Sequence, residues 1–134
     1  MAANLQVRDV MTAQPDSIHE ASSLEDAQLK MSGGHFRHLP VVNDDDEVVG
    51  VLSERDVQLA RALFQRQSQR VLGVDGVYED QVMCVSEAEA VHDVALRMAE
   101  GKVGCVVVRN DAGKLVGVFT TTDACRALYD ATRP

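Results

Sequence analysis

Two short motifs in the chain place a carboxylate three positions after a hydroxyl. They are Ser53-x-x-Asp56 and Thr120-x-x-Asp123. An Asp in the first turn of a helix can accept hydrogen bonds from both hydroxyls of a ribose, while the Ser or Thr hydroxyl and free backbone N–H groups suit a phosphate, which the helix dipole attracts. The same spacing also makes a helix cap, in which the hydroxyl accepts a backbone N–H and the acid favours the N-terminus. The motifs therefore predict either clamps for a nucleoside phosphate or plain caps.

A group of basic and imidazole side chains, His35, Arg37 and His38, stands just before an apolar run that starts at Leu39. Two histidines three positions apart would suit a zinc site on a helix face. This stretch instead leads into a predicted strand, and no further pair of ligands is apparent. The residues therefore favour a surface position over a metal site.

An acidic run, residues 44–47, lies between two apolar runs. It could hold a cation, but Asn and Asp also favour turns because their side chains bond their own backbone. The corresponding stretch later in the chain, "NDAGK", keeps only one acid. We therefore expect a solvated hairpin turn.

Both hydroxyl–carboxylate motifs belong to a longer repeat. A shift of 67 positions, from Gly50 to Gly117, superposes most of residues 18–60 on 85–127 without a gap. Self-similarity at a fixed period indicates that one supersecondary unit has been duplicated. We divide the chain into a first repeat (1–64), a linker (65–76) and a second repeat (77–134).

Each repeat has the same predicted order of elements. A short extended stretch precedes a helix, whose apolar stripe is Leu24, Ala27 and Met31 in the first repeat and Val91, Val94, Ala95 and Met98 in the second. Ser22 or Ser23 can cap the first helix, and Gly33 and Gly34 suit its end. A β-hairpin follows, and a second helix begins at Ser53 or Thr120. The predicted fold class is α+β, with two pseudo-symmetric β-α-β-β-α repeats.

Composition narrows the classes of partner and compartment. The net charge of −8 over 134 residues disfavours nucleic acid. No apolar stretch approaches the ~18 residues of a membrane span, and the first residues lack the pattern of a signal peptide, so we expect a cytoplasmic protein. The three cysteines, which form no CxxC pair, are predicted to be reduced, buried thiols: Cys84, Cys105 and Cys125.

The duplicated unit, the "RHLPVV" strand and the motif Gly-apolar-x-Ser/Thr-x-x-Asp together resemble a tandem pair of cystathionine-β-synthase (CBS) domains, from residue 7 to about residue 130. The resemblance implies clefts between the paired sheets that bind adenosine-containing ligands such as AMP, ADP, ATP or S-adenosylmethionine. It also implies a disc-like homodimer. The ligand-binding positions that it implies are Ile18, Arg37, His38, Pro40, Ser53, Arg55, Asp56, Val85, Cys105, Thr120, Thr122 and Asp123.

The resemblance places Arg37 and His38 where they could meet the phosphate or the base of a ligand. The equivalent positions in the second repeat are Gly104 and Cys105, so the two sites cannot be chemically equivalent. The second repeat also has no proline before its first strand and has "VVV" where the first has "LPV". Both departures make the second site less similar to the family pattern than the first site is.

Three functional hypotheses remain at this point. The favoured one is a regulatory module that senses an adenosyl small molecule, needs no obligatory cofactor and signals to an unknown protein partner. The alternative is a structural dimerisation module whose motifs only cap helices. A metal or redox protein using His35, His38 and the cysteines is a third hypothesis. We predict no enzyme, because no P-loop, paired catalytic acids or activated nucleophile is apparent.

Overall fold

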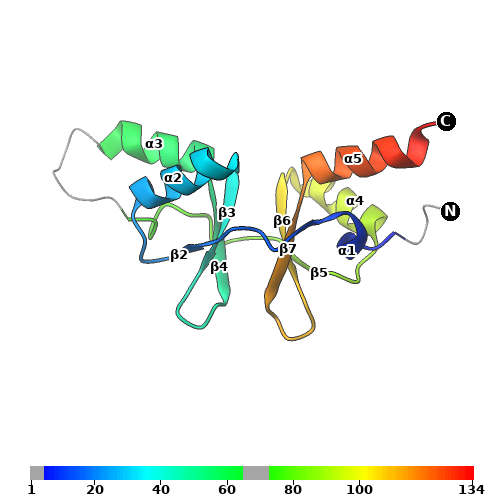
Figure 1. Cartoon of the computed structure of the whole chain (residues 1–134), viewed down its shortest axis with the longest axis horizontal. Coiled ribbons are helices and arrows are strands. Elements are labelled where there is room, and N and C mark those ends of the chain that lie inside the picture. The colour runs from blue at the N-terminus through cyan, green and yellow to red at the C-terminus, as the bar shows by residue number, and fades with distance from the viewer. Residues whose placement is uncertain (1–4, 65–72) are drawn as a thin grey trace. The chain divides into compact units, whose positions relative to one another are not determined.

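The structure, a computed structural model, describes residues 5–64 and 73–134. The chain divides into two compact units, each built around one sheet (Figure 1). The three-stranded unit comprises residues 16–82, and the four-stranded unit comprises residues 1–15 together with 83–134. Each unit contains the β-α-β-β-α order, which confirms the predicted α+β class.

The three-stranded unit has the strand order β2-β3-β4, in which β2 is parallel and β4 antiparallel to β3. Figure 1 shows α2 and α3 on the same side of this sheet. Its elements are β2 (Ile18–His19), α2 (Leu24–Gly34), β3 (His38–Val42), β4 (Val48–Ser53) and α3 (Glu54–Phe64).

The four-stranded unit has the strand order β1-β7-β6-β5. Strand β5 is parallel to β6, and β7 pairs antiparallel with both β6 and the two-residue β1. Its elements are α1 (Val7–Val10), β1 (Thr12–Ala13), β5 (Cys84–Ser86), α4 (Val91–Gly101), β6 (Cys105–Arg109), β7 (Leu115–Thr120) and α5 (Thr121–Thr132).

Helix α2 begins where its sequence predicts and ends differently. Ser23 is the N-cap, and its Oγ accepts the backbone N–H of Asp26 at 3.0 Å. Gly33 and Gly34, expected to end the helix, lie in its last turn, and the left-handed residue that ends it is His35, with φ of 58°. Lys102 adopts the same conformation after α4, with φ of 54°. A left-handed residue at this position lets the chain turn out of a helix, and neither repeat uses glycine for it.

Each unit has its own cluster of buried apolar side chains, drawn from the predicted stripes and strands. One is centred on Ile18, Leu24, Ala27, Met31, Leu39, Val41, Leu52, Val57, Ala60 and Val74. The other is centred on Val7, Val85, Val94, Met98, Val106, Val108 and Phe119. On α3, Val57 and Ala60 are buried, whereas Leu63 and Phe64 remain 57% and 48% exposed.

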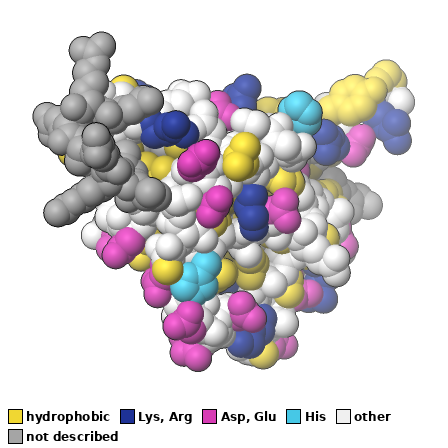
Figure 2. All heavy atoms as spheres, turned by 60° about the vertical axis from the view of Figure 1, so that its left-hand side comes forward, with side chains coloured by type: hydrophobic (Ala, Val, Ile, Leu, Met, Phe, Trp, Pro, Cys, Tyr) yellow, Lys and Arg dark blue, Asp and Glu magenta, His cyan; other side chains and the backbone are white. Residues whose placement is uncertain are grey.

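Other large apolar side chains also remain open to solvent, and all of them lie on helices. Figure 2 shows apolar side chains scattered among charged ones on one face. The exposed set is Leu29, Leu59, Leu63, Phe64, Leu96, Leu128 and Tyr129.

The leading segment of each repeat joins the sheet of the other repeat. In the four-stranded unit, β1 pairs with β7 through Thr12 and Val118. In the three-stranded unit, Glu79 exchanges backbone hydrogen bonds with Val51 of β4 at 2.9 and 3.0 Å. Since Thr12 and Glu79 differ by the repeat shift, as do Val118 and Val51, the two contacts are equivalent. We define the leading segments as residues 5–13 and 73–80.

The predicted linker, residues 65–76, lies partly outside the described residues. Of the part that is described, Val74 is fully buried in the core cluster of the three-stranded unit. We therefore count residues 73–76 as part of a leading segment. The boundaries 1–64, 65–76 and 77–134 describe the repeat in the sequence, and the two compact units have different bounds.

Candidate functional site

Ser53 and Asp56 lie at the junction of β4 and α3, in the three-stranded unit. The Ser53 Oγ accepts the backbone N–H of Asp56 at 3.0 Å, so this hydroxyl does cap the helix. The Asp56 side chain is half-buried, and its carboxylate accepts no hydrogen bond from any described residue. Capping therefore uses the backbone of Asp56 and leaves its charge available.

Arg37 and His38 are brought to this junction by the first strand of the hairpin. His38 lies opposite Ser53 in the β3–β4 ladder, and the backbone N–H of Glu54 donates to the Arg37 carbonyl at 2.8 Å. Arg37 is exposed, and His38 is half-buried. We call Arg37, His38, Ser53 and Asp56 the Asp56 site.

The two basic side chains of the Asp56 site, Arg37 and His38, differ in charge at neutral pH. Burial lowers the pKa of His38 below its ordinary value of 6.5, the Asp56 charge opposes this shift, and the Arg37 charge adds to it. His38 is therefore a neutral hydrogen-bonding group at neutral pH, and Arg37 supplies the positive charge. Together with Asp56, the site offers one cation, one anion and one neutral imidazole.

Thr120 and Asp123 lie at the corresponding junction of β7 and α5, in the four-stranded unit. Here the carboxylate does accept hydrogen bonds. Asp123 Oδ2 accepts the backbone N–H of Thr120 at 3.0 Å and its hydroxyl at 3.2 Å, while Thr120 Oγ1 accepts the Asp123 N–H at 3.3 Å. The Thr12 hydroxyl of β1 also donates to the carboxylate, 3.2 and 3.3 Å from its two oxygens. Asp123 is only 5% exposed. We call Thr12, Cys105, Thr120 and Asp123 the Asp123 site.

The Asp123 site has no counterpart of Arg37 and His38. Gly104 and Cys105 take their places, and Cys105 lies opposite Thr120 in the β6–β7 ladder. Burial, reinforced by the Asp123 charge, raises the pKa of the Cys105 thiol to about 12. The thiol is therefore uncharged at neutral pH and a poor nucleophile.

Thr12 accounts for much of the difference between the two carboxylates, and the sequence reasoning missed it. Its equivalent in the three-stranded unit is Glu79, whose carboxylate accepts the backbone N–H of Gln81 at 2.9 Å and can donate nothing to Asp56. The repeated Val-x-x-Val at 7–10 and 74–77 is the sequence signal that could have extended the repeat to these positions.

The remaining predicted ligand positions are either buried in strands or exposed at the start of a helix. Ile18 and Val85 are 3% and 4% exposed and belong to the core clusters, so a ligand could meet little of their side chains. Pro40 is also buried, within β3, whereas Arg55 and Thr122 are exposed in the first turns of α3 and α5.

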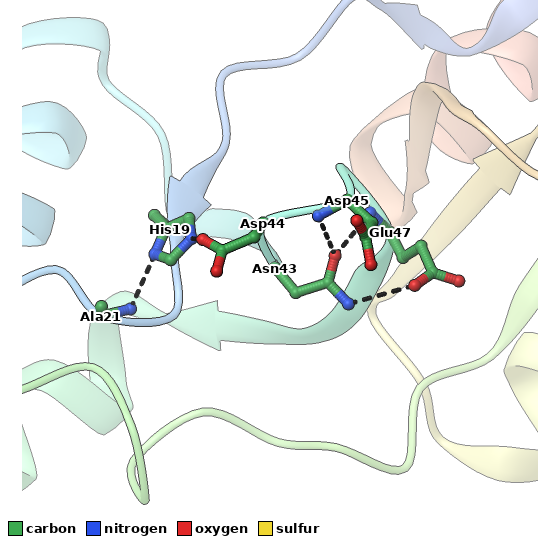
Figure 3. Close-up of polar contacts among 6 residues, drawn as sticks. All are labelled: His19, Ala21, Asn43, Asp44, Asp45 and Glu47. Carbon is green, nitrogen blue, oxygen red and sulfur yellow. Dashed lines mark hydrogen bonds and ion pairs between the residues drawn. The ribbon is translucent and has the colours of Figure 1, made fainter.

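The acidic run forms the turn of the β3–β4 hairpin, as predicted. Figure 3 shows the Asn43 side chain inside this turn, where its Oδ1 accepts the backbone N–H groups of Asp45 and Glu47 at 3.0 Å each. His19 is close by, and its Nε2 lies 2.7 Å from Asp44 Oδ1. Since His19 Nδ1 accepts the Ala21 N–H at 3.0 Å, Nε2 carries the proton and donates to Asp44. The described residues contain no group of three or more His, Cys, Asp or Glu placed to hold a metal ion.

The cysteines differ from the expectation of three buried thiols. Cys105 is buried and Cys84 is half-buried, but Cys125 is exposed, because it lies on the outer side of α5 away from the core position of Ala127. Within residues 5–64 and 73–134, none of the helices has the length and apolar character that a membrane span requires.

The structure contains two β-α-β-β-α repeats, each with a hydroxyl–carboxylate motif at its second helix. A comparison with models of known families finds the same two repeats. The sequence model of the CBS domain matches residues 7–62 and 74–130, so the chain belongs to the CBS domain family. The two matches begin within the two leading segments and include Thr12 and Glu79, in agreement with the structural equivalence of these residues.

Several solved structures share the fold over nearly the whole chain. A Vibrio cholerae protein provisionally assigned to acetoin utilization (AcuB) is 26% identical with a TM-score of 0.85, covering 96% of this chain and 94% of that chain. The CBS domain pair of MJ0100, solved with 5′-methylthioadenosine and S-adenosyl-L-methionine, is 25% identical with a TM-score of 0.82, covering 96% and 98%. CBSX2, solved with AMP, shares the fold at 24% identity and a TM-score of 0.79, covering 96% and 98%.

Among curated relatives, the chain matches one region of longer proteins. An L-aspartate semialdehyde sulfurtransferase of Methanocaldococcus jannaschii is 27% identical over 120 residues, which cover 90% of this chain and 22% of that protein. A homoserine O-acetyltransferase of Methanosalsum zhilinae is 26% identical over 116 residues, covering 87% and 22%. The chain thus spans less than a quarter of the length of these relatives.

Proposed function

We propose that the chain is a regulatory module that binds an adenosyl small molecule at the Asp56 site and passes its occupancy to a protein partner. The observation that carries this proposal is the half-buried Asp56 carboxylate, which has no hydrogen-bond donor among the described residues and lies beside Arg37 and His38. The complex of the MJ0100 CBS pair with two adenosyl ligands supports the class of ligand.

Each group of the Asp56 site has a defined task in this proposal. Asp56 accepts hydrogen bonds from the two ribose hydroxyls, which satisfies a carboxylate that the fold leaves without donors. Arg37 binds an anionic group of the ligand, either the phosphate of a nucleotide or the carboxylate of S-adenosylmethionine. His38, uncharged at neutral pH, can hydrogen-bond to the ligand without adding charge.

The Asp123 site is proposed to be mainly structural. Its carboxylate already accepts hydrogen bonds from Thr12 and Thr120, so a ribose would have to displace existing donors. It also lacks a cation at the positions of Arg37 and His38. One ligand per chain is therefore the expected stoichiometry.

Binding is proposed in place of catalysis. The relatives that are named as enzymes are matched over only 22% of their length, so their reactions need not belong to the matched region. The second candidate function, a structural module without a ligand, is favoured by the observation that Ser53 and Thr120 both cap their helices.

Isothermal calorimetry with S-adenosylmethionine, 5′-methylthioadenosine, AMP, ADP and ATP tests the proposal. Asp56→Ala should weaken binding roughly tenfold to a hundredfold, because hydrogen bonds to a charged group are lost. Asp26→Ala is the matched control, since Ser23-x-x-Asp26 makes the same cap on α2 in an exposed position. Equal losses in the two variants, or no binding of any compound to the wild type at millimolar concentration, would favour the structural module.

A further inference from the structure

An apolar groove lies between α4 and α5 of the four-stranded unit. Its volume is about 320 Å³, near the lower end of the range for sites that hold small molecules. Six of its lining residues are apolar: Ala95, Met98, Ala99, Val103, Gly104 and Ala124. Most of these side chains are small, so the two helices leave a space that an apolar ligand could fill.

The groove has one polar end. Lys102 and Thr121 are the polar residues that line it. Lys102 directly follows the last residue of α4, and Thr121 is the first residue of α5. The backbone N–H of Thr121 donates to the Gly104 carbonyl at 3.1 Å, which holds these two helix ends together. Both polar residues therefore belong to the same end of the groove.

The apolar part of the groove extends from this end along α4. Ala95 precedes Lys102 by seven positions, which corresponds to about 10 Å along a helix. Among the residues that line the groove, Lys102 is the charged one, although the chain as a whole has a net charge of −8. A cation at one end of an apolar wall is complementary to a ligand with an anionic head and an apolar body.

Two differences between the repeats favour such a ligand in the second one. Under the repeat shift, Val103 corresponds to the larger Phe36, which packs against the core cluster of the three-stranded unit. Thr121 corresponds to Glu54, whose negative charge would repel an anion. The second repeat thus has more space and no acidic side chain at these two positions.

We infer that the α4–α5 groove binds a small amphiphilic acid, with its carboxylate at Lys102 and its hydrocarbon body along Ala95 and Ala124. The Lys102 ammonium donates charge-assisted hydrogen bonds to the carboxylate, and the Thr121 hydroxyl is a further donor. The volume of the groove favours a free small molecule over a segment of a partner protein. None of these residues belongs to the Asp56 site, so the inference goes beyond the proposed function and does not depend on it.

An amide NMR titration of the wild type with butanoate, hexanoate and octanoate tests the inference. Octanoate should shift the amide signals of lining residues such as Ala95, Lys102 and Gly104. Affinity should rise about fourfold for each methylene group that the groove buries, because each one removes apolar surface from water. Octylammonium, which has the same body and the opposite charge, should bind more weakly than octanoate.

Lys102→Glu should reverse this order, so that octylammonium binds more tightly than octanoate. Because Lys102 is exposed, the expected loss of octanoate affinity is about threefold to tenfold. The position is already left-handed, with φ of 54°, and Glu adopts this conformation about as readily as Lys. Arg126→Glu is the matched control, since it makes the same change of charge on α5 at an exposed residue that does not line the groove.

A second variant tests the apolar part of the groove. Val103→Phe introduces the residue found at the equivalent position 36 and should fill part of the space. It should weaken the binding of octanoate and of octylammonium alike, without reversing their order. Circular dichroism checks that the variant is folded, and Ala99→Leu replaces it if it is not.

Three outcomes would overturn the inference. Amide shifts that are absent at millimolar octanoate, or that lie away from the groove, show that the acid does not bind there. Equal affinities of the wild type for octanoate and octylammonium show that Lys102 does not select an anion. Groove signals that move with protein concentration and not with octanoate show that a second copy of the chain is the occupant.

Discussion

At the scale of single residues, the same motif places its two carboxylates in different surroundings. Asp123 is buried and accepts hydrogen bonds from Thr12 and Thr120, which compensate for its removal from water. Asp56 occupies the equivalent place without a donor to its carboxylate among the described residues, and it is more exposed. The first arrangement holds β1 against α5, and the second leaves a charge that a ligand can use.

His38 should make stability depend on pH. Its pKa is lowered in the folded state, mainly by burial, so the unfolded chain binds a proton more readily than the folded chain does. Its contribution is fully present above the unfolded pKa of about 6.5 and is lost as pH falls toward the lower folded value. His38→Gln should therefore lose less stability than the wild type between about pH 7.5 and about pH 5.

Urea denaturation at a series of pH values measures this difference. His92→Gln is the control, because the His92 side chain is 71% exposed. A pH profile of His38→Gln that runs parallel to that of the wild type would show that His38 does not carry the effect.

The sequence could predict the hydroxyl–carboxylate motifs, but it could not distinguish their roles. Capping by Ser53 and Thr120 follows from spacing along one helix, and both caps are present. The contact between Thr12 and Asp123 joins residues 111 positions apart, and a local pattern carries no information about it. The chemical difference between the sites was nevertheless predictable from Gly104 and Cys105 in place of Arg37 and His38.

At the scale of elements, a glycine in each hairpin lets a leading segment approach. A Cβ at Gly50 would lie 2.5 Å from the Glu79 carbonyl oxygen and would overlap the Tyr78 ring. At Gly117, a Cβ would lie 2.9 Å from the Thr12 carbonyl oxygen and 2.5 Å from Met11 Sδ. The repeated glycine that first revealed the duplication therefore marks the place where each leading segment crosses a strand.

Gly50→Ala should destabilise the chain by about 1–3 kcal/mol, because the new methyl group overlaps backbone that cannot rotate away. The backbone pairing of Val51 with Glu79 should weaken as the leading segment is pushed outward. Gly104→Ala is the matched control, since no described atom lies within 4 Å of its Cβ position. Chemical denaturation compares the two; similar stability would show that the leading segment yields at little cost.

The main elements were predictable, and the leading segments were not. Stripes such as Leu24, Ala27 and Met31 identify a helix because each repeats a buried face, and all three are buried. Strand β1 has only two residues, Thr12 and Ala13, so it offers no alternation from which pairing could be inferred. Its partner β7 is also distant in sequence, so only the fold reveals the contact.

At the scale of the whole molecule, the exchanged leading segments tie each repeat to the stability of the other. Val7 belongs to the first repeat but is buried in the core of the four-stranded unit. Val74 lies in the leading segment 73–80, which runs into the second repeat, but is buried in the core of the three-stranded unit. Neither continuous repeat therefore contains its complete core, and a chain cut between the repeats would separate both cores from a buried residue.

This exchange predicts a crossed pattern of local stability. Val7→Ala and Val74→Ala each remove two buried methyl groups at equivalent positions and should cost about 2 kcal/mol. Val7 is buried in the unit that contains the hairpin of the second repeat, and Val74 in the unit that contains the hairpin of the first. Val7→Ala should therefore lower amide-exchange protection chiefly in β6 and β7, and Val74→Ala chiefly in β3 and β4. Hydrogen exchange followed by mass spectrometry resolves these strands, and each variant serves as the control for the other. If protection were lost within the repeat that carries the substitution, the leading segments would not be exchanged in solution.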